Sequence, residues 1–358
     1  MKIKNIKTKV ITMELLKPIV VTFGVISTFD SLILEIETDT GLYGYGEAAP
    51  FAPVTGETIA TVQAMISLFT KALVGEDPLK ISRLHRIMDG IVQGNTSAKA
   101  AVDIALYDIY AKTLNVPLYV ALGGDDNTFE SDKTVSIGTV EEMVADVKSD
   151  MAQGFRMVKL KAGNDSAKDV RALKAIREAC GDSLVIRMDA NQGWHTEEAI
   201  RTINEMEAYG LDAIEQPIPG WDFEGLRKIQ EKVNVPVMAD ESLHSEFDAV
   251  KLIKSNSVNL FNIKLMKSKG ILGASRINSI AEAAGIECMI GCMGESPVAI
   301  TAGAHFAAAN KNLTRVDLDI LFAIKPNEKI TGGVQYEGGV ATLPETPGLG
   351  VNVDFESL

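Results

Sequence analysis

Five short apolar segments of this sequence end in polar side chains that could do chemistry. They end in Lys159-Leu160-Lys161, Asp189-Ala190-Asn191, Glu215-Gln216-Pro217, Asp240-Glu241-Ser242 and Asn262-Ile263-Lys264. Three consecutive segments therefore supply carboxylates, and the segments before and after them supply lysines. If parallel strands bring these ends together, the set predicts a site in which carboxylates lie between lysines.

The carboxylates indicate a site for a hard metal ion. Asp189, Glu215 and Asp240 follow one another at separations of 26 and 25 residues, so that each would end one of three consecutive strands. One such carboxylate alone would more simply cap the following helix. Three in register, with no Cys or His beside them, favour an oxygen-only site for one Mg²⁺ ion over a Zn²⁺ site.

The lysines on either side of these carboxylates are candidate bases. Alternation along a strand directs Lys159 and Lys161 to the same side, and Lys264 would lie across the metal site. Lys161 and Lys264 could then face opposite sides of one substrate carbon, as a two-base proton exchange requires. We expect neighbouring positive charges to lower the pKa values of these lysines. Solvated surface charge would explain any one lysine but not the flanking pattern.

The elements that must position these residues have the rhythm of a βα barrel. After the first third of the chain, short apolar runs recur about every 25 to 30 residues with amphipathic helical stretches between them. The predicted strands are Lys133–Ile137, Met157–Lys161, Leu184–Asp189, Ala213–Glu215, Val237–Ala239, Leu260–Lys264, Glu287–Gly291 and Thr314–Asp317. Eight parallel strands close a barrel of the TIM type, whose active site lies at the C-terminal strand ends.

The remaining segments predict a smaller α+β domain beside the barrel. Lys2–Met13 and Ser31–Glu37 alternate with the strand period, whereas Thr58–Val74 and Ala98–Leu114 have helical spacing. The Gly- and Pro-rich tail over Ile330–Phe355 should return to this domain. We therefore predict an α/β protein with a capping domain over residues 1–125, a (β/α)7β barrel over 126–325 and a returning segment over 326–358.

Composition and charge narrow the class of protein. With 46% hydrophobic and 23% charged residues, the 358-residue chain can bury a large core. Its net charge of -13 opposes binding to nucleic acid, and no apolar run reaches the roughly 20 residues of a membrane helix. The three cysteines lack metal-ligand spacing, so we expect free thiols in a reducing cytoplasm. We expect a small-molecule substrate and a homo-oligomer.

Taken together, the motifs resemble the muconate-lactonizing subgroup of the enolase superfamily. The Lys-x-Lys, Asp-x-Asn, Glu-Gln-Pro, Asp-Glu-Ser and Asn-Ile-Lys-Leu series carries this resemblance along the predicted barrel. Further motifs are similar to those of dipeptide epimerases: Gly44-Tyr45-Gly46-Glu47-Ala48, Thr55-Gly56-Glu57, Asn191-Gln192-Gly193-Trp194, Lys264-Leu265-Met266-Lys267, Cys292-Met293-Gly294-Glu295-Ser296 and Asp317-Leu318-Asp319. The resemblance covers essentially the whole chain. It implies an isomerase that removes and returns the α-proton of a dipeptide's C-terminal residue.

The resemblance also implies roles for individual residues. Lys161 and Lys264 would be the opposed bases, and Lys159 would support the substrate carboxylate electrostatically. Asp317 and Asp319 would bind the free ammonium group of the dipeptide, with the residue between them turned away. We expect further substrate contacts from Ile19, Phe23, Gly24, Val54, Ser136, Asn191, Met293 and Glu295.

Two positions depart from the family pattern. Epimerases of this family that act on Ala-Glu carry an arginine where this sequence has Gly24, inside an apolar loop from Ile19 to Ile26. An acidic side chain would lose its partner there, so we expect a preference for hydrophobic or aromatic dipeptides. The other departure is Lys269, which replaces a common glycine beyond the active strand.

Several alternatives stay open at this stage. They are an L-Ala-D/L-Glu epimerase of murein peptide catabolism, an o-succinylbenzoate synthase, an N-succinylamino-acid racemase and a non-catalytic ligand-binding barrel. Asp317 and Asp319 argue against the succinyl substrates, which have no free ammonium group, and a pair of opposed lysines argues against binding alone. The four histidines, His85, His195, His244 and His305, do not end strands as the lysines do, which argues against mandelate racemase and sugar-acid dehydratase chemistry.

Overall fold

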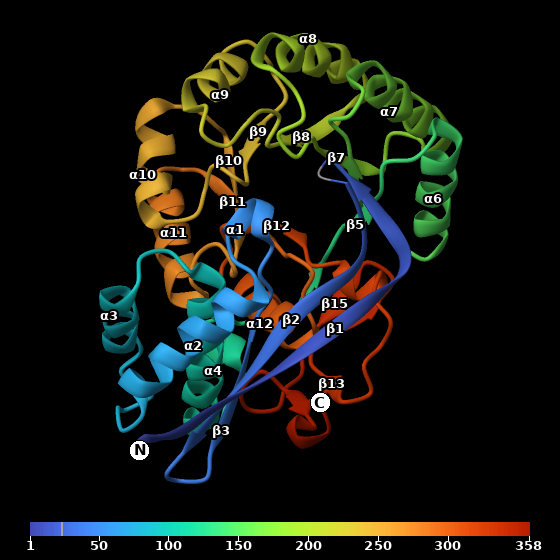
Figure 1. The fold of residues 1–358 in the computed structure, drawn as a ribbon. Helices are drawn as coiled ribbons and strands as arrows, with labels where there is room; N and C mark the ends of the chain where they lie inside the picture. Colours follow the sequence, from blue (N-terminus) through green and yellow to red (C-terminus); the bar gives the residue numbers. More distant parts are fainter. Residues whose placement is uncertain (23) are drawn as a thin grey trace.

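A barrel and a capping layer built from both ends of the chain make up the molecule (Figure 1). The structure is a computed structural model that describes residues 1–22 and 24–358. Phe23, one of the residues expected to contact substrate, lies outside the described residues. None of the helices in the described part of the chain has both the length and the apolar character needed to cross a membrane.

Eight parallel strands form the barrel sheet, in the order β12-β11-β10-β9-β8-β7-β6-β5. They are β5 (Lys133–Val135), β6 (Met157–Lys161), β7 (Val185–Asp189), β8 (Leu211–Glu215), β9 (Val237–Ala239), β10 (Leu260–Lys264), β11 (Glu287–Gly291) and β12 (Leu313–Asp317). The predicted barrel is confirmed, and each predicted strand lies within two residues of the observed bounds.

Helices alternate with these strands and cover the outside of the sheet (Figure 1). They are α6 (Val140–Ala152), α7 (Ser166–Cys180), α8 (Thr196–Met206), α9 (Phe223–Gln230), α10 (Glu246–Ser255), α11 (Ile271–Ala283) and α12 (Pro297–Ala308), with short turns η1 (Glu207–Tyr209) and η2 (Ile320–Phe322). Several begin with a side-chain cap that satisfies a free backbone N–H, as Thr139 does for α6 and Asp165 for α7. The caps fix where each loop above the barrel ends.

The capping layer is an antiparallel sheet packed against helices. Its strands are β1 (Ile3–Val21), β2 (Gly24–Thr38) and β3 (Tyr43–Ala48), and its helices are α1 (Ala52–Thr55), α2 (Ile59–Leu73), α3 (Ile81–Ile91), α4 (Thr96–Leu114) and α5 (Leu118–Ala121). Gly46 lets α4 approach the sheet, because a Cβ there would lie 1.9 Å from the carbonyl oxygen of Ala101. This contact explains a glycine of the Gly44–Ala48 motif.

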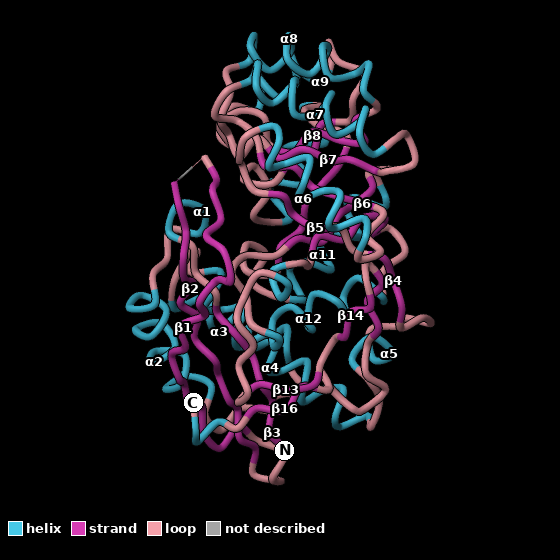
Figure 2. The backbone as a smooth tube through the Cα atoms, turned by 90° about the vertical axis from the view of Figure 1, so that its right-hand side faces the viewer, coloured by secondary structure: helices cyan, strands magenta, loops and turns pink. Residues whose placement is uncertain are grey.

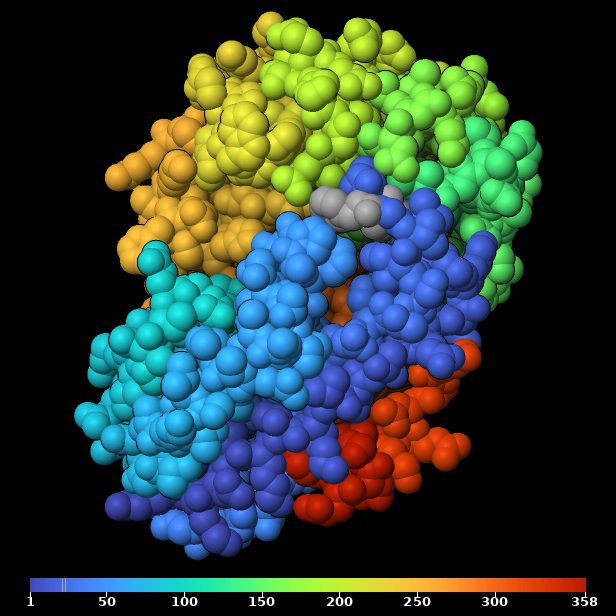
Figure 3. Space-filling view, viewed as in Figure 1, coloured from blue at the N-terminus to red at the C-terminus, as the bar shows by residue number. Residues whose placement is uncertain are grey.

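The first two strands are much longer than the rest of their sheet. β1 and β2 continue past β3 as a hairpin whose end lies over the mouth of the barrel (Figures 1 and 2). The hydroxyl of Thr22 donates to the carbonyl oxygen of Asn191 at 3.0 Å, so the hairpin contacts a loop of the barrel. In the space-filling view β1 and β2 cross the face of the molecule below the barrel helices (Figure 3). The sequence predicted the strands as ending at Met13 and beginning at Ser31, so this extension was missed.

The C-terminal tail contacts the capping sheet as well as the barrel. β13 (Ile330–Gly332) pairs with β16 (Val351–Val353), and β14 (Gln335–Glu337) and β15 (Val340–Thr342) form a second sheet with β4 (Thr128–Glu130); η3 (Phe355–Ser357) ends the chain. Lys9 Nζ donates to the carbonyl oxygen of Leu358 at 3.1 Å. The tail therefore reaches β1, while the domain boundaries at residues 125 and 325 stay a prediction.

Candidate functional site

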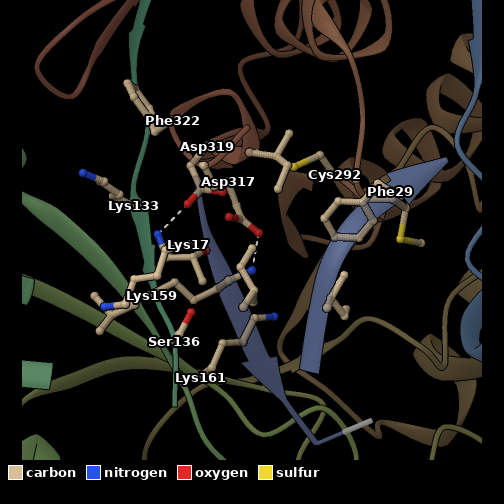
Figure 4. A pocket seen from close by; sticks show the side chains of 18 of the residues that line it. Lys17, Phe29, Lys133, Ser136, Lys159, Lys161, Cys292, Asp317, Asp319 and Phe322 are labelled. Atoms are coloured by element: carbon tan, nitrogen blue, oxygen red, sulfur yellow. Dashed lines mark hydrogen bonds and ion pairs between the residues drawn. The ribbon is translucent and has the colours of Figure 1, made fainter. Parts of the chain in front are cut away.

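A cavity of about 390 Å³ lies between the C-terminal ends of the barrel strands and the β1–β2 hairpin (Figure 4). Its walls include most of the residues predicted from the sequence, namely Lys159, Lys161, Asn191, Asp240, Lys264, Asp317, Asp319, Ile19, Val54, Ser136 and Met293. Asp189 and Glu215 are buried and lie next to the lining residues Lys161 and Lys159 without being part of the wall. The barrel thus gathers residues that are far apart in the sequence.

Strand register aligns the predicted residues at the same height on neighbouring strands, in two groups. Lys161 pairs with Asp189, which pairs with Glu215, across β6, β7 and β8. Across β10, β11 and β12, Lys264 is level with Asp317, with Gly291 between them. Parallel pairing of whole strands therefore brings one lysine to each side of the cluster of carboxylates.

The three carboxylates predicted to hold a metal ion are almost completely buried. Asp189 Oδ1 accepts the backbone N–H of Asn191 at 2.9 Å, and Glu215 Oε1 accepts Nδ2 of Asn262 at 2.7 Å. Burial and the charge of Asp189 raise the pKa of Glu215 to about 7. Although burial opposes it, the ammonium groups of Lys264 and Lys267 hold the pKa of Asp240 well below its usual value.

This donor set fits a hard divalent cation. Besides the three predicted ligands, Glu241 lines the cavity with a buried Oε2 atom that has no hydrogen-bond partner. Burial and the charge of Asp240 raise the pKa of Glu241 to about 8. Within the described part of the chain, no three Asp, Glu, His or Cys side chains converge as a ready metal site, and the carboxylates instead contact lysines. Crowded buried carboxylates repel one another, and a cation that binds oxygen relieves that repulsion.

The lysines reach the carboxylates from both sides, as predicted. Lys161 Nζ lies 2.7 Å from Asp189, and Lys264 Nζ lies 2.9 Å from Asp240. Lys159 Nζ contacts Asp317 and lies 3.9 Å from both Asp189 and Glu215. Lys159 and Lys161 therefore face the same side of β6, as strand alternation requires.

The carboxylates around two of these lysines raise the lysine pKa values. Burial alone would lower the pKa of Lys159, but Asp317 and Glu215 raise it well above its usual value. Burial is likewise outweighed at Lys264, whose pKa is raised by the charges of Asp240 and Glu215. The predicted lowering includes the charge of a metal ion bound beside the lysines, so it stays a prediction. The carboxylates that surround Lys159 and Lys264 act in the opposite direction.

The Asp-x-Asp pair stands at the end of β12, where Asp317 is buried and Asp319 is half-buried. Asp317 accepts from Lys159, and Asp319 Oδ2 accepts the backbone N–H of Thr134 at 2.5 Å. The Oδ1 atom of Asp317 is buried without a hydrogen-bond partner. Leu318 is turned away and packs near Gly303 of α12, as predicted. The pair therefore offers negative charge and at least one free acceptor to the cavity.

Apolar side chains of the capping layer form the opposite wall. Ile19 and Ile26 are direct partners across the hairpin, and both line the cavity. Phe29 of β2, Phe51 beside α1 and Val54 of α1 extend this wall. Burial of an apolar ligand group against such a wall is favourable, whereas a charged group would find no partner on it.

Gly24 lies at the end of the hairpin and does not line the cavity. Its φ of +132° belongs to a region that L side chains rarely adopt, and a Cβ built there would meet nothing within 4 Å. An arginine could fit the space only by changing the backbone conformation of the hairpin. Among the described residues of this loop, Ile19 and Ile26 face the cavity.

Three other residues of the motifs and departures noted in the sequence have supporting positions. Glu295 is buried outside the cavity wall, where its Oε1 accepts the backbone N–H of Met293 at 2.8 Å and so fixes a loop that lines the cavity. Lys267 is buried against Asp240 and Asn262 O, so it cannot reach a substrate side chain. Lys269 forms an ion pair with Asp89 of α3 at 2.9 Å, away from the cavity.

Two of the four histidines, His85 and His305, have structural positions. His305 Nδ1 accepts the backbone N–H of Tyr119, and its ring stacks on the tyrosine ring. Burial lowers the pKa of His305 to about 4, so the ring is neutral. His85 contacts Asp103 at 2.6 Å inside the capping layer. Neither ring lines the cavity.

Sequence reasoning missed several residues of the cavity wall. Phe29, Lys133 and Phe322 all line it, although none ends a barrel strand. Lys133 begins β5, and Phe322 belongs to η2. Glu241 was quoted only as part of a motif, and its position beside a predicted ligand was the one available signal. The others come from segments whose sequence alone gives no reason to meet the strand ends.

Family models match nearly the whole chain. The model "Mandelate racemase / muconate lactonizing enzyme, N-terminal domain" matches residues 5–123, and the model "Enolase C-terminal domain-like" matches residues 142–358. The hydrophobic dipeptide epimerase of Enterococcus faecalis is 42% identical over 354 residues, which cover 98% of this chain and 100% of that protein. The L-Ala-D/L-Glu epimerase of Bacillus subtilis is 40% identical, with 98% of this chain and 97% of that protein covered.

Solved structures agree with these matches. The E. faecalis dipeptide epimerase complexed with Mg and L-Leu-L-Tyr superposes with a TM-score of 0.96 at 42% identity, covering 98% of this chain and 100% of that one. The B. subtilis epimerase in a substrate-liganded complex also has a TM-score of 0.96, at 39% identity and with 99% of this chain and 100% of that one covered. An N-succinyl-L-Arg/Lys racemase of Bacillus cereus is similar at 37% identity over 364 residues, which cover 100% of this chain and 97% of that protein.

Proposed function

Because this chain belongs to the mandelate racemase and muconate lactonizing enzyme family of the enolase superfamily, we propose that it is a Mg²⁺-dependent dipeptide epimerase. It inverts the α-carbon of the C-terminal residue by a two-base 1,1-proton transfer. The observation that supports this proposal most strongly is the placement of Lys161 and Lys264 on opposite sides of buried carboxylates. The Asp-x-Asp pair beside them suits an ammonium group.

Asp189, Glu215 and Asp240 would hold the metal ion. Their oxygen atoms are the donor type that Mg²⁺ prefers, and their mutual repulsion in a buried site favours a bound cation. Relatives with solved structures are complexed with Mg and a dipeptide. When bound, Mg²⁺ would hold the substrate carboxylate and stabilise the negative charge that develops beside it on deprotonation.

The chain's own residues would move the proton. The Nζ atom of one of Lys161 and Lys264 takes the α-proton from one face, and the ammonium group of the other returns a proton to the opposite face. The base must be neutral at that moment. For Lys264 the carboxylates that raise its pKa therefore have to be charge-balanced first. Lys159 provides fixed positive charge where negative charge develops.

Asp317 and Asp319 would bind the free N-terminal ammonium group. Asp317 Oδ1 is a buried acceptor without a partner, which an ammonium donor would satisfy. An N-succinyl group offers no cation to this pair. The pair therefore favours a dipeptide over the N-succinylamino acids of the related racemase.

The apolar wall would select the epimerised side chain. Ile19, Ile26 and Val54 would bury a hydrophobic or aromatic side chain, which gains about 1.5–3 kcal/mol. A glutamate side chain would lie against the same wall without a partner, which costs several kcal/mol. The preference for hydrophobic dipeptides over L-Ala-L-Glu follows from the sign of this difference.

The test is to measure kcat/KM for L-Ala-L-Phe, L-Ile-L-Tyr and L-Ala-L-Glu by deuterium incorporation in D₂O. We expect the hydrophobic dipeptides to exceed L-Ala-L-Glu by about tenfold or more. A value about tenfold higher for L-Ala-L-Glu would assign the protein to the Ala-Glu epimerases instead.

Paired variants of the hairpin test the origin of this preference. Ile26→Arg puts a cation on the cavity wall and should raise relative activity on L-Ala-L-Glu. Val25→Arg, at the neighbouring position that is 68% exposed and outside the wall, is the matched control and should leave the ratio unchanged. These variants avoid the backbone strain that Gly24→Arg would introduce. The free thiols suit a cytoplasmic location, which we include in the proposal together with a homo-oligomeric state.

A further inference from the structure

The cavity continues beyond the Asp-x-Asp pair to the place where the barrel closes. β5 and β12 are the two end strands of the eight-stranded sheet. Directly before β5, the backbone N–H of Asp132 donates to the carbonyl oxygen of Val316 in β12 at 3.0 Å. Within β5, the backbone N–H of Thr134 donates instead to the side chain of Asp319, which follows β12, at 2.5 Å. The carboxylate therefore takes the place of a backbone partner where the two strands part.

An extension of the cavity lies on the outer side of this edge, and we call it the outer arm. Its lining residues are Lys133, Ser149, Asp150, Gln153, Phe322 and Leu16. The backbone N–H of Leu16 donates to the carbonyl oxygen of Ala323 at 2.7 Å, so β1 covers the arm. Figure 4 shows Lys133 and Phe322 beyond Asp319, on the side away from Lys161.

The charges around the outer arm already have partners. Lys133 Nζ lies 2.7 Å from Asp150 and stands over the rings of Phe155 and Phe322, at 5.1 and 5.7 Å from their centroids. At the rim Lys17 pairs with Asp146 at 3.4 Å. A charged side chain that entered the arm would have to break one of these pairs or stay unpaired, and both are unfavourable. An uncharged side chain would pack against Phe322 and Leu16 without that cost.

We propose that the outer arm takes the side chain of the substrate's N-terminal residue and selects large uncharged side chains there. The inference rests on the proposed function, because an ammonium group held at Asp317 and Asp319 places the N-terminal α-carbon at the entrance of the arm. The wall of Ile19, Ile26 and Val54 is then left for the C-terminal side chain. The outer arm thus binds the side chain of the N-terminal residue, and the apolar wall binds that of the C-terminal residue.

A substrate series tests this directly with the wild-type protein and Mg²⁺. Dipeptides Xaa-L-Phe with Gly, Ala, Leu, Phe, Glu or Lys as Xaa are compared by kcat/KM. We expect Leu and Phe to exceed Gly by about ten- to a hundredfold, and Glu and Lys to fall at or below Ala. A series that is flat within about twofold, or one led by Glu or Lys, would overturn the inference.

A variant that fills the arm provides an independent test. Ser149 is an exposed residue of α6 that lines the arm, so Ser149→Trp should fill it without unfolding the helix. Lys148→Trp puts the same side chain at the neighbouring exposed position, which does not line the cavity. We expect Ser149→Trp to lose about tenfold on L-Leu-L-Phe but little on Gly-L-Phe, and Lys148→Trp to behave as wild type.

The outcomes separate this inference from the proposed function. Equal losses on both substrates in Ser149→Trp, or no loss on either, would remove the arm's role while leaving dipeptide epimerisation intact. A wild-type protein that epimerises none of the dipeptides would refute the proposed function, and the inference with it. Thermal unfolding of both tryptophan variants shows whether a loss of activity occurs in a folded protein or results from unfolding.

Discussion

Three carboxylates of the capping layer, Glu47, Asp103 and Asp108, are as deeply buried as the carboxylates of the cavity. We call them the interdomain cluster because each accepts a backbone N–H from outside that layer. Their partners differ from those in the cavity. Glu47 accepts from the backbone N–H groups of Ser296 and Ala299 at the start of α12, and also from the hydroxyls of Ser31 and Ser296. In the cavity, the partners of the carboxylates are mainly lysine side chains.

The other two members of the interdomain cluster follow the same rule. Asp103 of α4 accepts the backbone N–H of Ile271, at the start of α11, and contacts His85. Asp108 accepts the backbone N–H groups of Tyr45 and Leu349, and it also accepts from Lys112 Nζ at 2.7 Å. Apart from Tyr45, the backbone partners belong to the barrel helices and to the C-terminal tail, so the interdomain cluster stabilises the packing of the capping layer against both.

The comparison shows how burial can serve two purposes. None of the side-chain oxygens of the interdomain cluster lacks a partner, whereas Glu241 Oε2 and Asp317 Oδ1 in the cavity do. A fully satisfied buried carboxylate stabilises one arrangement, while an unsatisfied one is ready for a ligand. Changes in the cavity should therefore affect chemistry first, and changes in the interdomain cluster should affect folding first.

Removal of the metal should have the largest effect. Because the carboxylates of the cavity need a cation to bind the substrate carboxylate, exhaustive chelation with EDTA should reduce epimerisation to background, and added Mg²⁺ should restore it. Activity is followed by proton exchange in D₂O. Full turnover after chelation would contradict the role of Asp189, Glu215 and Asp240.

Loss of either base comes next. Lys161→Ala and Lys264→Ala should each reduce epimerisation by about 10²- to 10⁴-fold, because each base serves one direction of the exchange. One of the two variants should still exchange deuterium into a single stereoisomer. Both should keep a cooperative unfolding transition close to that of the wild type. Normal epimerisation by either would show that the bases are misassigned.

A change in the interdomain cluster should instead reduce the stability of the protein. Glu47→Ala leaves the buried N–H groups of Ser296 and Ala299 without an acceptor and should lower the free energy of unfolding by about 3–5 kcal/mol. Glu47→Gln keeps an acceptor and should cost less. Chemical denaturation measures both. An alanine variant as stable as the wild type would contradict the stabilising role of the interdomain cluster.

Acylation of the substrate should have the smallest of these effects. N-acetyl-L-Ala-L-Phe cannot supply an ammonium group to Asp317 and Asp319, so its kcat/KM should fall more than about tenfold below that of L-Ala-L-Phe, which corresponds to roughly 1.5–3 kcal/mol. Asp319→Asn should narrow the difference between the two substrates. Equal rates on the free and acetylated dipeptides would refute the amine-binding role.

The sequence alone determined the barrel strands and the polar residues that end them. The alternation that exposes Lys159 and Lys161 to one side is a local property of β6, and so is the placement of Asp189 at the end of β7. Strand period and chain order therefore suffice to place these residues around one axis. The departure at Gly24 was also visible in the sequence.

Tertiary structure decided what surrounds each of these groups. The pKa of Lys159 is raised by Asp317, which is 158 residues away in the chain, and no local pattern predicts that contact. The outer arm depends on the edge between the first and last barrel strands and on the cover that Leu16 provides from β1. Electrostatic fields and cavities arise from residues that the fold brings together, so they follow from packing and not from period or composition.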